Sequence, residues 1–291
     1  MGTKLLQRLC TFGGRRNMSS VTEHYGEKKN LLNIIVEAFE KEGVIDSLTV
    51  DHLAPIDEFH IGGREATNDF INQLEISQNH NVLDIGCGLG GPSRFVASKF
   101  GCKVTGVDLT PEFISCGKKL TEMVNLTDKV KLLTGSALDL HSVLDQNEFF
   151  DRAFMLHVGM NIENKSLLLS EIASKLKTGG LLGIYDVMKF GKNSHEDLEF
   201  PVPWTNNHKN NYATHPEEYK EAIEKAGMRI ICERNRYDFA VEFFSKMKSK
   251  KDVPSIGLHL IMNEFPQKTG NMLKNLKKER IAPIEMIAEK V

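Results

Sequence analysis

The stretch Val82-Leu83-Asp84-Ile85-Gly86-Cys87-Gly88-Leu89-Gly90-Gly91 joins a short apolar segment to a glycine-rich turn. Gly86, Gly88 and Gly91 satisfy the spacing G-x-G-x-x-G, which is typical of a loop whose backbone approaches a nucleotide-like ligand. A helix that begins directly after such a loop presents unpaired N–H groups to the ligand. The stretch therefore predicts a strand–turn–helix unit that binds a nucleotide or a related molecule.

The chain around this turn alternates strands with helices. The expected strands are short apolar runs at 82–85, 103–108, 130–133, 149–156, 181–187, 228–233 and 281–289, the last broken by Pro283. The expected helices of this region lie at 94–100, 111–124, 164–176, 216–226 and 241–251. Strands that alternate with helices at this spacing predict right-handed βαβ units. The fold class is therefore α/β, with a doubly wound, mostly parallel sheet that is covered on both faces.

The sequence also predicts a division into segments. Residues 1–22 carry four basic and no acidic side chains, so they are expected to be either a targeting segment or a solvated tail. Residues 23–78 are expected to form an N-terminal helical cap, and residues 79–291 the core, with a lid-like insert at about 188–214. Within the cap we expect helices at 27–42 and from Arg64 onward, with an irregular stretch at 51–63.

Composition narrows the classes of function. The 291 residues carry a formal net charge of −2, which gives no general attraction to nucleic acid or to an anionic membrane. A lysine run at 246–251 is read as a solvated helix face. No apolar run approaches the roughly 18 residues of a membrane span. The five cysteines form no Cys-x-x-Cys pair, so neither a disulfide framework nor a metal site is expected.

These features predict where the protein works. We expect the cytoplasm or, if residues 1–22 are a presequence, the mitochondrial matrix, and no secretion. The expected partner is a small molecule, with no nucleic acid and no membrane span. Nothing in the sequence predicts an oligomeric state.

Two nucleotide chemistries compete for the glycine turn. In dinucleotide-binding oxidoreductases an acid about 20 residues beyond the turn binds a ribose, and Asp108 fits that spacing. S-adenosylmethionine has no phosphate and carries a cationic sulfonium and an ammonium group, so it favours an acid beside the loop itself. Asp84, two residues before Gly86, is such an acid. Asp84 therefore favours S-adenosylmethionine, with Asp108 accepting hydrogen bonds from the ribose hydroxyls.

Further motifs follow in the order and spacing of one family. They are the quoted turn, Val104-Thr105-Gly106-Val107-Asp108-Leu109, Gly135-Ser136-Ala137, Phe150-Asp151-Arg152-Ala153-Phe154, Leu176-Lys177-Thr178-Gly179-Gly180-Leu181-Leu182 and His215-Pro216-Glu217-Glu218-Tyr219. Over about residues 80–235 this set resembles the class I S-adenosylmethionine-dependent methyltransferases. The resemblance implies a seven-stranded, Rossmann-like sheet and S-adenosylmethionine as cofactor. The implied cofactor-binding residues are Asp84, Gly86, Cys87, Gly88, Gly90, Asp108, Leu109, Ser136, Ala137 and His157.

One residue departs from the family pattern. Ser136 stands where the family usually has an aspartate that contacts the adenine amino group. The Ser136 hydroxyl, the Ala137 backbone and Asp139 are alternatives for this contact, and they stay open.

Three residues are candidates for catalysis. His157 follows the fourth strand, and it acts either as a base or by packing over the adenosyl group. Asp186 ends the fifth strand, where it either attracts a cationic amine or lies in water. His60, on the irregular stretch beside Gly62, is expected to face the pocket.

Three more residues have open alternatives. Phe59 is either a core residue of the cap or a cation–π partner for a methylated ammonium. Asn161 either orients the substrate or caps the next helix, and Trp204 anchors the lid or lines the pocket.

The motifs resemble the small-molecule branch that includes glycine, sarcosine and dimethylglycine N-methyltransferases and phosphoethanolamine N-methyltransferases. The expected acceptor is accordingly an amine nitrogen. The alternative within enzymes is a C- or O-methyltransferase of a lipid-like or quinone substrate. From other classes, an NAD-dependent oxidoreductase and a non-catalytic cofactor-binding protein stay open. A pocket lined by Asp186, His60 and aromatic side chains would favour the amine, and an almost wholly apolar pocket would favour the lipid-like substrate.

Overall fold

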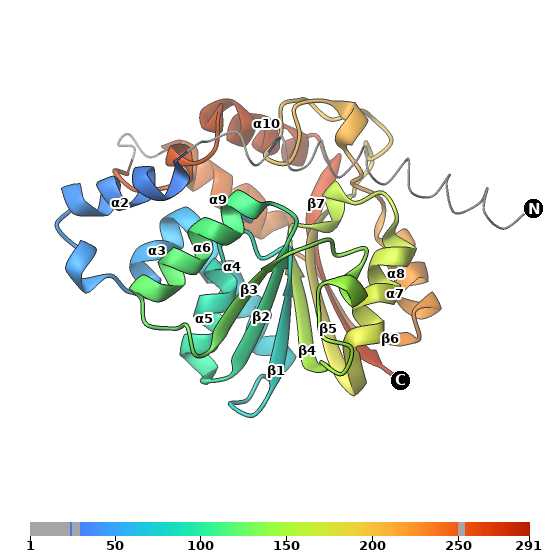
Figure 1. Cartoon of the computed structure of the whole chain (residues 1–291). Helices are drawn as coiled ribbons and strands as arrows, with labels where there is room; N and C mark the ends of the chain where they lie inside the picture. The colour runs from blue at the N-terminus through green and yellow to red at the C-terminus, as the bar shows by residue number, and fades with distance from the viewer. Residues whose placement is uncertain (1–23, 25–29, 250–253) are drawn as a thin grey trace, which may run out of the picture.

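A computed structural model describes residue 24, residues 30–249 and residues 254–291 of the chain. Its described part is built around one seven-stranded sheet (Figure 1). The strands lie in the order β3-β2-β1-β4-β5-β7-β6. Their bounds are β1 Asn81–Ile85, β2 Lys103–Asp108, β3 Val130–Thr134, β4 Phe150–Leu156, β5 Leu176–Lys189, β6 Met228–Asn235 and β7 Ile281–Lys290.

The sheet is mostly parallel. Strands β1 to β5 pair in parallel, whereas β7 is antiparallel to both of its neighbours, β5 and β6. Chain order reverses between β1 and β4, because β1 is followed by β2 on one side and the later strands add on the other. The prediction of a doubly wound, mostly parallel, seven-stranded α/β fold is confirmed.

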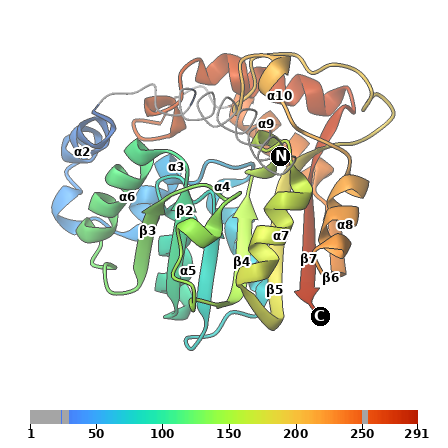
Figure 2. The same cartoon turned by 45° about the vertical axis from the view of Figure 1, so that its right-hand side comes forward.

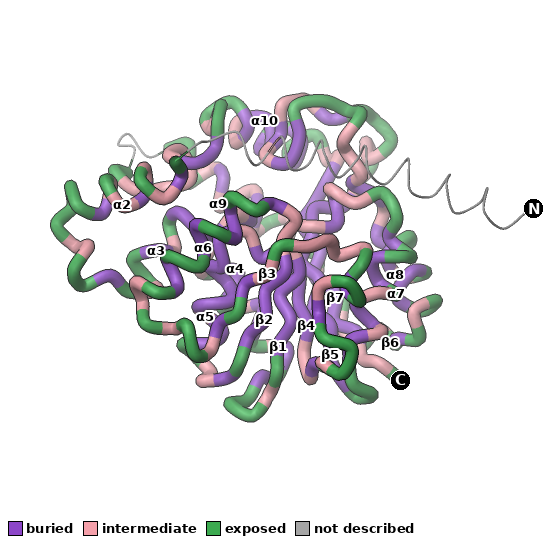
Figure 3. Tube along the Cα trace, viewed as in Figure 1, coloured by how far each residue is buried: buried purple, intermediate pink, exposed green. Residues whose placement is uncertain are grey.

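Helices cover both faces of the sheet. Apolar side chains of α4, α5 and α6 pack on one face, and those of α7 and α8 pack on the other. Figure 3 shows the strands between these layers as mostly buried, which is why they read as continuous apolar runs. The bounds are α4 Gly63–Ile71, α5 Gly91–Phe100, α6 Pro111–Met123, α7 Lys165–Lys175 and α8 Pro216–Lys225.

A further layer, which we call the upper layer, lies over the carboxyl ends of the parallel strands (Figures 1 and 2). Its helices are α9 Tyr237–Ser249 and α10 Phe265–Lys277, and at its edge lie α2 Leu31–Lys41, which contacts α6, and α3 Val50–Asp57, which contacts α4 and α5. Residues 190–214 also belong to this layer and are irregular apart from the short 3-10 helix η5, His208–Asn210. The layer is held by its own apolar clusters, one of which includes Trp204, Phe244 and Met272.

The expectation of an irregular stretch at 51–63 is wrong in its first half, where α3 forms. Thr49 and His52 make a reciprocal capping box that fixes the start of this helix. Pro55 sits inside it, and the burial of Leu53 and Ile56 compensates for the hydrogen bond that the proline lacks.

The sequence analysis also predicted no helix where α10 forms. Its buried face contains the polar residues Lys268, Asn271 and Asn275 beside Met272 and Leu276, and this mixture hides the apolar period. Pro283, by contrast, does not interrupt β7, where it pairs with Val187 of β5.

Several expectations about segments stay predictions. The targeting segment or tail at 1–22 lies outside the described residues, as do Lys250 and Lys251 of the lysine run. The division into a cap at 23–78 and a core at 79–291 stays a prediction. None of the helices in the described part of the chain is both long and apolar enough to cross a bilayer.

Candidate functional site

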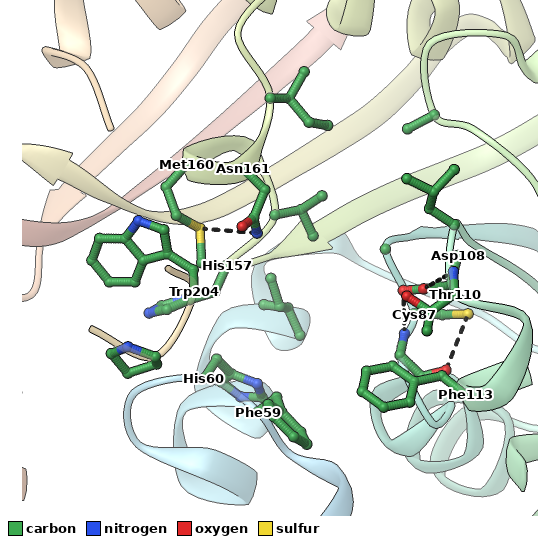
Figure 4. Close-up of a pocket in the computed structure, with 18 of the residues that line it drawn as sticks. Phe59, His60, Cys87, Asp108, Thr110, Phe113, His157, Met160, Asn161 and Trp204 are labelled. Carbon is green, nitrogen blue, oxygen red and sulfur yellow. Dashed lines mark hydrogen bonds between the residues drawn. The ribbon is translucent and has the colours of Figure 1, made fainter. Parts of the chain in front are cut away.

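A cavity of about 510 Å³ opens where the carboxyl ends of β1 to β4 meet the upper layer. In open α/β sheets a ligand crevice lies at this edge, where the strand order reverses. In Figure 4, Cys87, Asp108, Thr110 and Phe113 lie on one side of the pocket, and His157, Met160, Asn161 and Trp204 lie on the other. We call the part lined by the turns after β1, β2 and β3 the cofactor half. The acceptor half is the part lined by residues 59–61, 160–161 and 203–204, by α9 and α10, and by Leu258 and Met262 between these two helices.

Side chains of neighbouring segments pack closely against the glycine turn after β1. Gly86 has a φ of +69°, and a Cβ at this position would lie 2.4 Å from Val158 Cγ2. Gly86, Cys87 and Gly88 all line the cofactor half, as predicted. Gly90 is the exception, because it is not part of the cavity wall. It packs against Leu132 at the start of α5, so its assignment as a cofactor contact is corrected to a structural role.

Asp108 connects two of the turns that line the cofactor half. Its Oδ2 accepts a hydrogen bond of 2.9 Å from the Gly88 N–H, and its Oδ1 accepts one of 2.8 Å from the Thr110 N–H. Burial raises the pKa of Asp108, while these two backbone donors oppose the rise. Each oxygen retains a second lone pair, so the carboxylate can accept further hydrogen bonds from a ligand. Leu109 lines the cavity beside it.

Two buried acids flank the start of α5. Asp84 accepts a hydrogen bond of 2.6 Å from Ser93 Oγ, and burial raises the pKa of Asp84 to about 7. Asp57, at the end of α3, receives a 2.7 Å hydrogen bond from Arg94 Nη2, and burial raises the pKa of Asp57 to about 6. Both acids belong to the cavity wall. The sequence reading missed Asp57, since only the packing of α3 on α5 brings it to the site.

The turn after β3 forms another wall of the cofactor half. Ser136 and Ala137 line the cavity as expected, and Ser136 Oγ accepts a hydrogen bond of 3.1 Å from the Leu138 N–H. Asp139 is not in the wall, and its carboxylate instead accepts a hydrogen bond from Ser142. Asp139 is therefore not suited to contact the adenine, which leaves Ser136 and the Ala137 backbone.

His157 lies on the wall with an unusual backbone, at a φ of +55°. Its Nδ1 is 3.2 Å from the Tyr185 carbonyl oxygen, which only accepts, so Nδ1 carries the proton. Its Nε2 then accepts a long hydrogen bond of 3.5 Å from the Ile61 N–H. Burial lowers the pKa of His157 well below its ordinary value. Of the two alternatives, this arrangement favours a neutral ring that packs against a ligand.

His60 also lines the cavity, and its ring lies 6.0 Å from that of His157. Its Nε2 contacts the Gly63 carbonyl oxygen at 3.1 Å and Thr67 Oγ1 at 2.8 Å. Burial lowers the pKa of His60 to about 4, so the imidazole is neutral at physiological pH. Phe59 beside it lines the cavity and packs on Phe113 at 6.0 Å between ring centroids, so it is both a wall and a core residue.

Asp186 is not brought to the cavity, which corrects its assignment as a substrate-binding acid. It is fully buried on the other face of β5, where Oδ2 accepts a hydrogen bond of 2.5 Å from the Tyr219 hydroxyl. Burial raises the pKa of Asp186 to about 6, and the neighbouring Lys165 ammonium opposes this rise. The contrast with Tyr185, whose hydroxyl donates to the Ile61 carbonyl oxygen on the cavity side, reflects the alternation of side chains along a strand.

Two smaller expectations are also decided. Asn164, and not Asn161, caps α7, since its side chain accepts a hydrogen bond of 2.9 Å from the Leu167 N–H. Asn161 lines the cavity instead. Trp204 lines the cavity as well, while its indole N–H donates to Asn211 Oδ1 at 3.0 Å. It therefore serves as pocket wall and as anchor of the insert.

Comparisons with known proteins agree with this geometry. Residues 83–184 match a family model described as a methyltransferase domain. Residues 83–184 form a class I S-adenosylmethionine-dependent methyltransferase domain. The domain is similar to phosphoethanolamine N-methyltransferase 1 of Zea mays, at 26% identity over 74% of this chain and 40% of that protein. It is also similar to erythromycin 3''-O-methyltransferase of Saccharopolyspora erythraea, at 33% identity over 44% of this chain and 42% of that protein.

A solved structure extends the likeness of this methyltransferase fold over most of the chain. Geranyl diphosphate C-methyltransferase from Streptomyces coelicolor A3(2) superposes with a TM-score of 0.68 at 13% identity, covering 94% of this chain and 98% of that one. The chain spans between 33% and 62% of the length of the curated relatives that it matches. Because the relatives are named for nitrogen, oxygen and carbon acceptors, the methyltransferase domain fixes the donor chemistry but not the acceptor.

Proposed function

We propose that the chain transfers a methyl group from S-adenosylmethionine to an apolar small molecule. The observation that carries this proposal is the acceptor half of the cavity, which is built from methionine and aromatic side chains. Its apolar members include Met160, Trp204, Phe244, Met262, Phe265 and Met272. Such a wall buries apolar surface and adapts to irregular shapes, because methionine side chains are flexible and polarisable.

The charges of the cavity argue against an amine as acceptor. The polar side chains of the acceptor half are His60, Asn161 and Thr269, and none is an acid. Asp186, which was expected to attract the amine, lies on the other face of the sheet. Glu163 touches the cavity wall but is solvent-exposed, where its charge is screened. By the criterion set from the sequence, this pocket favours the lipid-like substrate over the amine.

The cofactor half offers complementary groups to S-adenosylmethionine. Asp84 and Asp57 lie beside the start of α5, where a carboxylate can receive the ammonium group of the cofactor. Asp108 is placed to accept the ribose hydroxyls. Ser136 and Ala137 would border the adenine. The remaining work of catalysis is alignment and exclusion of water, because the sulfonium is itself a strong leaving group.

Two measurements test this function. Calorimetry with S-adenosylhomocysteine asks whether the cofactor half binds the demethylated product. A release assay then measures S-adenosylhomocysteine formation from S-adenosylmethionine with apolar alcohols, phenols and alkenes against a matched set of amines. We expect binding, and turnover with the apolar set. Binding with turnover confined to amines would contradict the proposed acceptor, and failure to bind would contradict the function as a whole.

The acceptor half should be sensitive to polarity rather than to shape. Met262→Gln keeps the length of the side chain but places an amide in an apolar wall. Burying an amide without hydrogen-bond partners costs about 1–3 kcal/mol, so KM for an apolar acceptor should rise about 5- to 150-fold. Met262→Leu is the matched control and should change KM little. Equal KM values for both variants would show that the acceptor does not contact this wall.

The affinity for S-adenosylmethionine should increase with pH. Burial places the pKa of Asp57 at about 6 and that of Asp84 at about 7, so both are largely protonated and neutral in acid. As pH rises through these values they become carboxylates and attract the cationic ligand, and binding is accompanied by proton release. Calorimetry at about pH 5.5 and about pH 7.5 measures the difference. Asp84→Asn should flatten the dependence, and a pH-independent affinity of the unmodified protein would refute it.

A further inference from the structure

His60 is held by a hydrogen-bonded chain that runs away from the cavity into the cap. Its Nε2 lies 2.8 Å from Thr67 Oγ1, and that hydroxyl lies 2.5 Å from Glu58 Oε2. Nε2 also lies 3.1 Å from the Gly63 carbonyl oxygen and 3.4 Å from Glu58 Oε2 itself. His60, Thr67 and Glu58 are all buried. Neither Thr67 nor Glu58 is given any task by methyl transfer as described so far.

The partners of this chain determine the tautomer of His60. The Gly63 carbonyl oxygen only accepts hydrogen bonds, so Nε2 carries the hydrogen. The Thr67 hydroxyl donates to Glu58, so its oxygen is left to accept from Nε2. Nδ1 consequently keeps its lone pair. It has no hydrogen-bond partner among the residues that the structure describes, and His60 is part of the cavity wall.

Glu58 is equipped to act as a buried carboxylate in this chain. Arg64 Nε donates to Glu58 Oε1 at 2.7 Å, and Thr67 donates to Oε2, so both oxygens accept hydrogen bonds. Burial raises the pKa of Glu58, and the Arg64 guanidinium opposes that rise. A carboxylate behind an imidazole fixes its tautomer and stabilises the imidazolium that forms when the far nitrogen takes a proton.

We propose that His60 Nδ1 removes the proton of a hydroxyl group on an apolar acceptor, and that Thr67 and Glu58 position His60 for this step. This inference rests on the proposed function. In the step, the acceptor oxygen forms a bond to the methyl carbon as the carbon–sulfur bond breaks and its electron pair stays on sulfur. The hydroxyl proton moves to His60 Nδ1, and the imidazolium later releases it to water. The products are a methyl ether and S-adenosylhomocysteine.

The basicity of His60 selects the kind of hydroxyl. Its pKa of about 4 makes it a weak base, so it suits an acidic hydroxyl group. A phenol has a pKa of about 10, as tyrosine does, whereas water is at about 15.7 and aliphatic alcohols resemble water. The aromatic and methionine side chains of the acceptor half also fit an aryl ring, so the acceptor class is an apolar phenol. The other histidine of the site is a poorer base, because both ring nitrogens of His157 already make hydrogen bonds.

The test compares variants of the whole chain with 4-octylphenol as probe. Turnover is measured as S-adenosylhomocysteine release, with 4-octylanisole, whose oxygen is already methylated, as the blank. His60→Gln removes the base and should lower kcat about 10²- to 10⁴-fold while the affinity for S-adenosylhomocysteine stays unchanged. His141→Gln, at an exposed histidine, is the matched control and should leave kcat unchanged. Added imidazole should restore part of the turnover of His60→Ala.

The pH profile separates positioning from a merely structural role. The charged or titratable groups around His60 are Glu58 and Arg64 from the cap, His157 after β4 and Tyr185 on β5. Thr67→Val keeps the shape but breaks the chain, so the acid limb of kcat/KM should move to lower pH and kcat at pH 8 should fall about tenfold. Glu58→Gln should act in the same direction. Thermal unfolding checks that the variants remain folded.

Several outcomes would overturn the inference. One is S-adenosylhomocysteine binding without turnover of the phenol, which leaves the cofactor half of the proposed function intact. Another is a kcat of His60→Gln within about threefold of the unmodified protein. A third is an unshifted acid limb in Thr67→Val, which removes the positioning role. If the unmodified protein does not bind S-adenosylhomocysteine, the result would instead contradict the proposed function itself.

Discussion

Replacing Asp57 with alanine should destabilise the fold by about 3–5 kcal/mol, because the change leaves a buried guanidinium without its counter-charge. Arg94 is fully buried, and its Nη2 lies 2.7 Å from Asp57 Oδ2. The other hydrogen-bond acceptors of the Arg94 side chain are neutral, namely the Gly117 backbone carbonyl oxygen at 3.1 Å and Thr121 Oγ1 at 3.0 Å. The free energy of unfolding in denaturant measures the loss.

Asp51→Ala provides a matched control on the same helix. Asp51 pairs with Arg64, but its side chain is 87% exposed, so its loss should cost less than about 1 kcal/mol. The double change Asp57→Leu with Arg94→Met replaces the buried pair by apolar groups and should recover most of the stability. A loss below about 1 kcal/mol for Asp57→Ala alone would show that water reaches Arg94, so that the pair does not hold α3 on α5.

The part of the fold that the sequence predicts is the part where periodicity is undisturbed. The five parallel strands are apolar runs, and the turn before α5 carries glycines that its backbone geometry requires. In the upper layer, α2 and α9 lie close to the helices expected at 27–42 and 241–251, whereas α3 and α10 were not predicted, because a proline or polar side chains interrupt their apolar period. In α10, Asn275 is fully buried and exchanges hydrogen bonds with the Glu199 backbone, a tertiary interaction that no local pattern reveals.

The residues of the site also divide into those that the sequence predicted and those that it did not. Asp84 and Asp108 could be predicted because parallel strands place their carboxyl ends at one edge of the sheet. Asp57, Glu58 and Thr67 could not, since they reach the cavity or its supporting chain only through the packing of α3 and α4 on the core. For Asp186 a signal was present. Side chains alternate along a strand, so Tyr185 and Asp186 had to face opposite sides of the sheet.

Replacing Asp108 with alanine should weaken the binding of S-adenosylhomocysteine by about 1.5–3 kcal/mol, or about 10- to 150-fold, if its carboxylate accepts the ribose hydroxyls. Calorimetry measures the change. Asp139→Ala, after the neighbouring strand but outside the cavity wall, is the matched control and should leave the affinity as it is. An unchanged affinity in Asp108→Ala would contradict the assigned contact.

A weaker affinity alone does not identify the contact, because Asp108 also holds the Gly88 and Thr110 N–H groups and thereby shapes both turns. Adenosine and 2′-deoxyadenosine, as competitors of S-adenosylhomocysteine, separate the two effects. If Asp108 accepts from the 2′-hydroxyl, the unmodified protein should prefer adenosine and Asp108→Ala should lose that preference, since the coupling between the two deletions isolates their shared interaction. If the carboxylate only shapes the turns, Asp108→Ala should weaken the binding of both nucleosides equally, and the preference for adenosine should remain. A preference for adenosine that remains in Asp108→Ala would show that another group of the turn after β2 contacts the ribose.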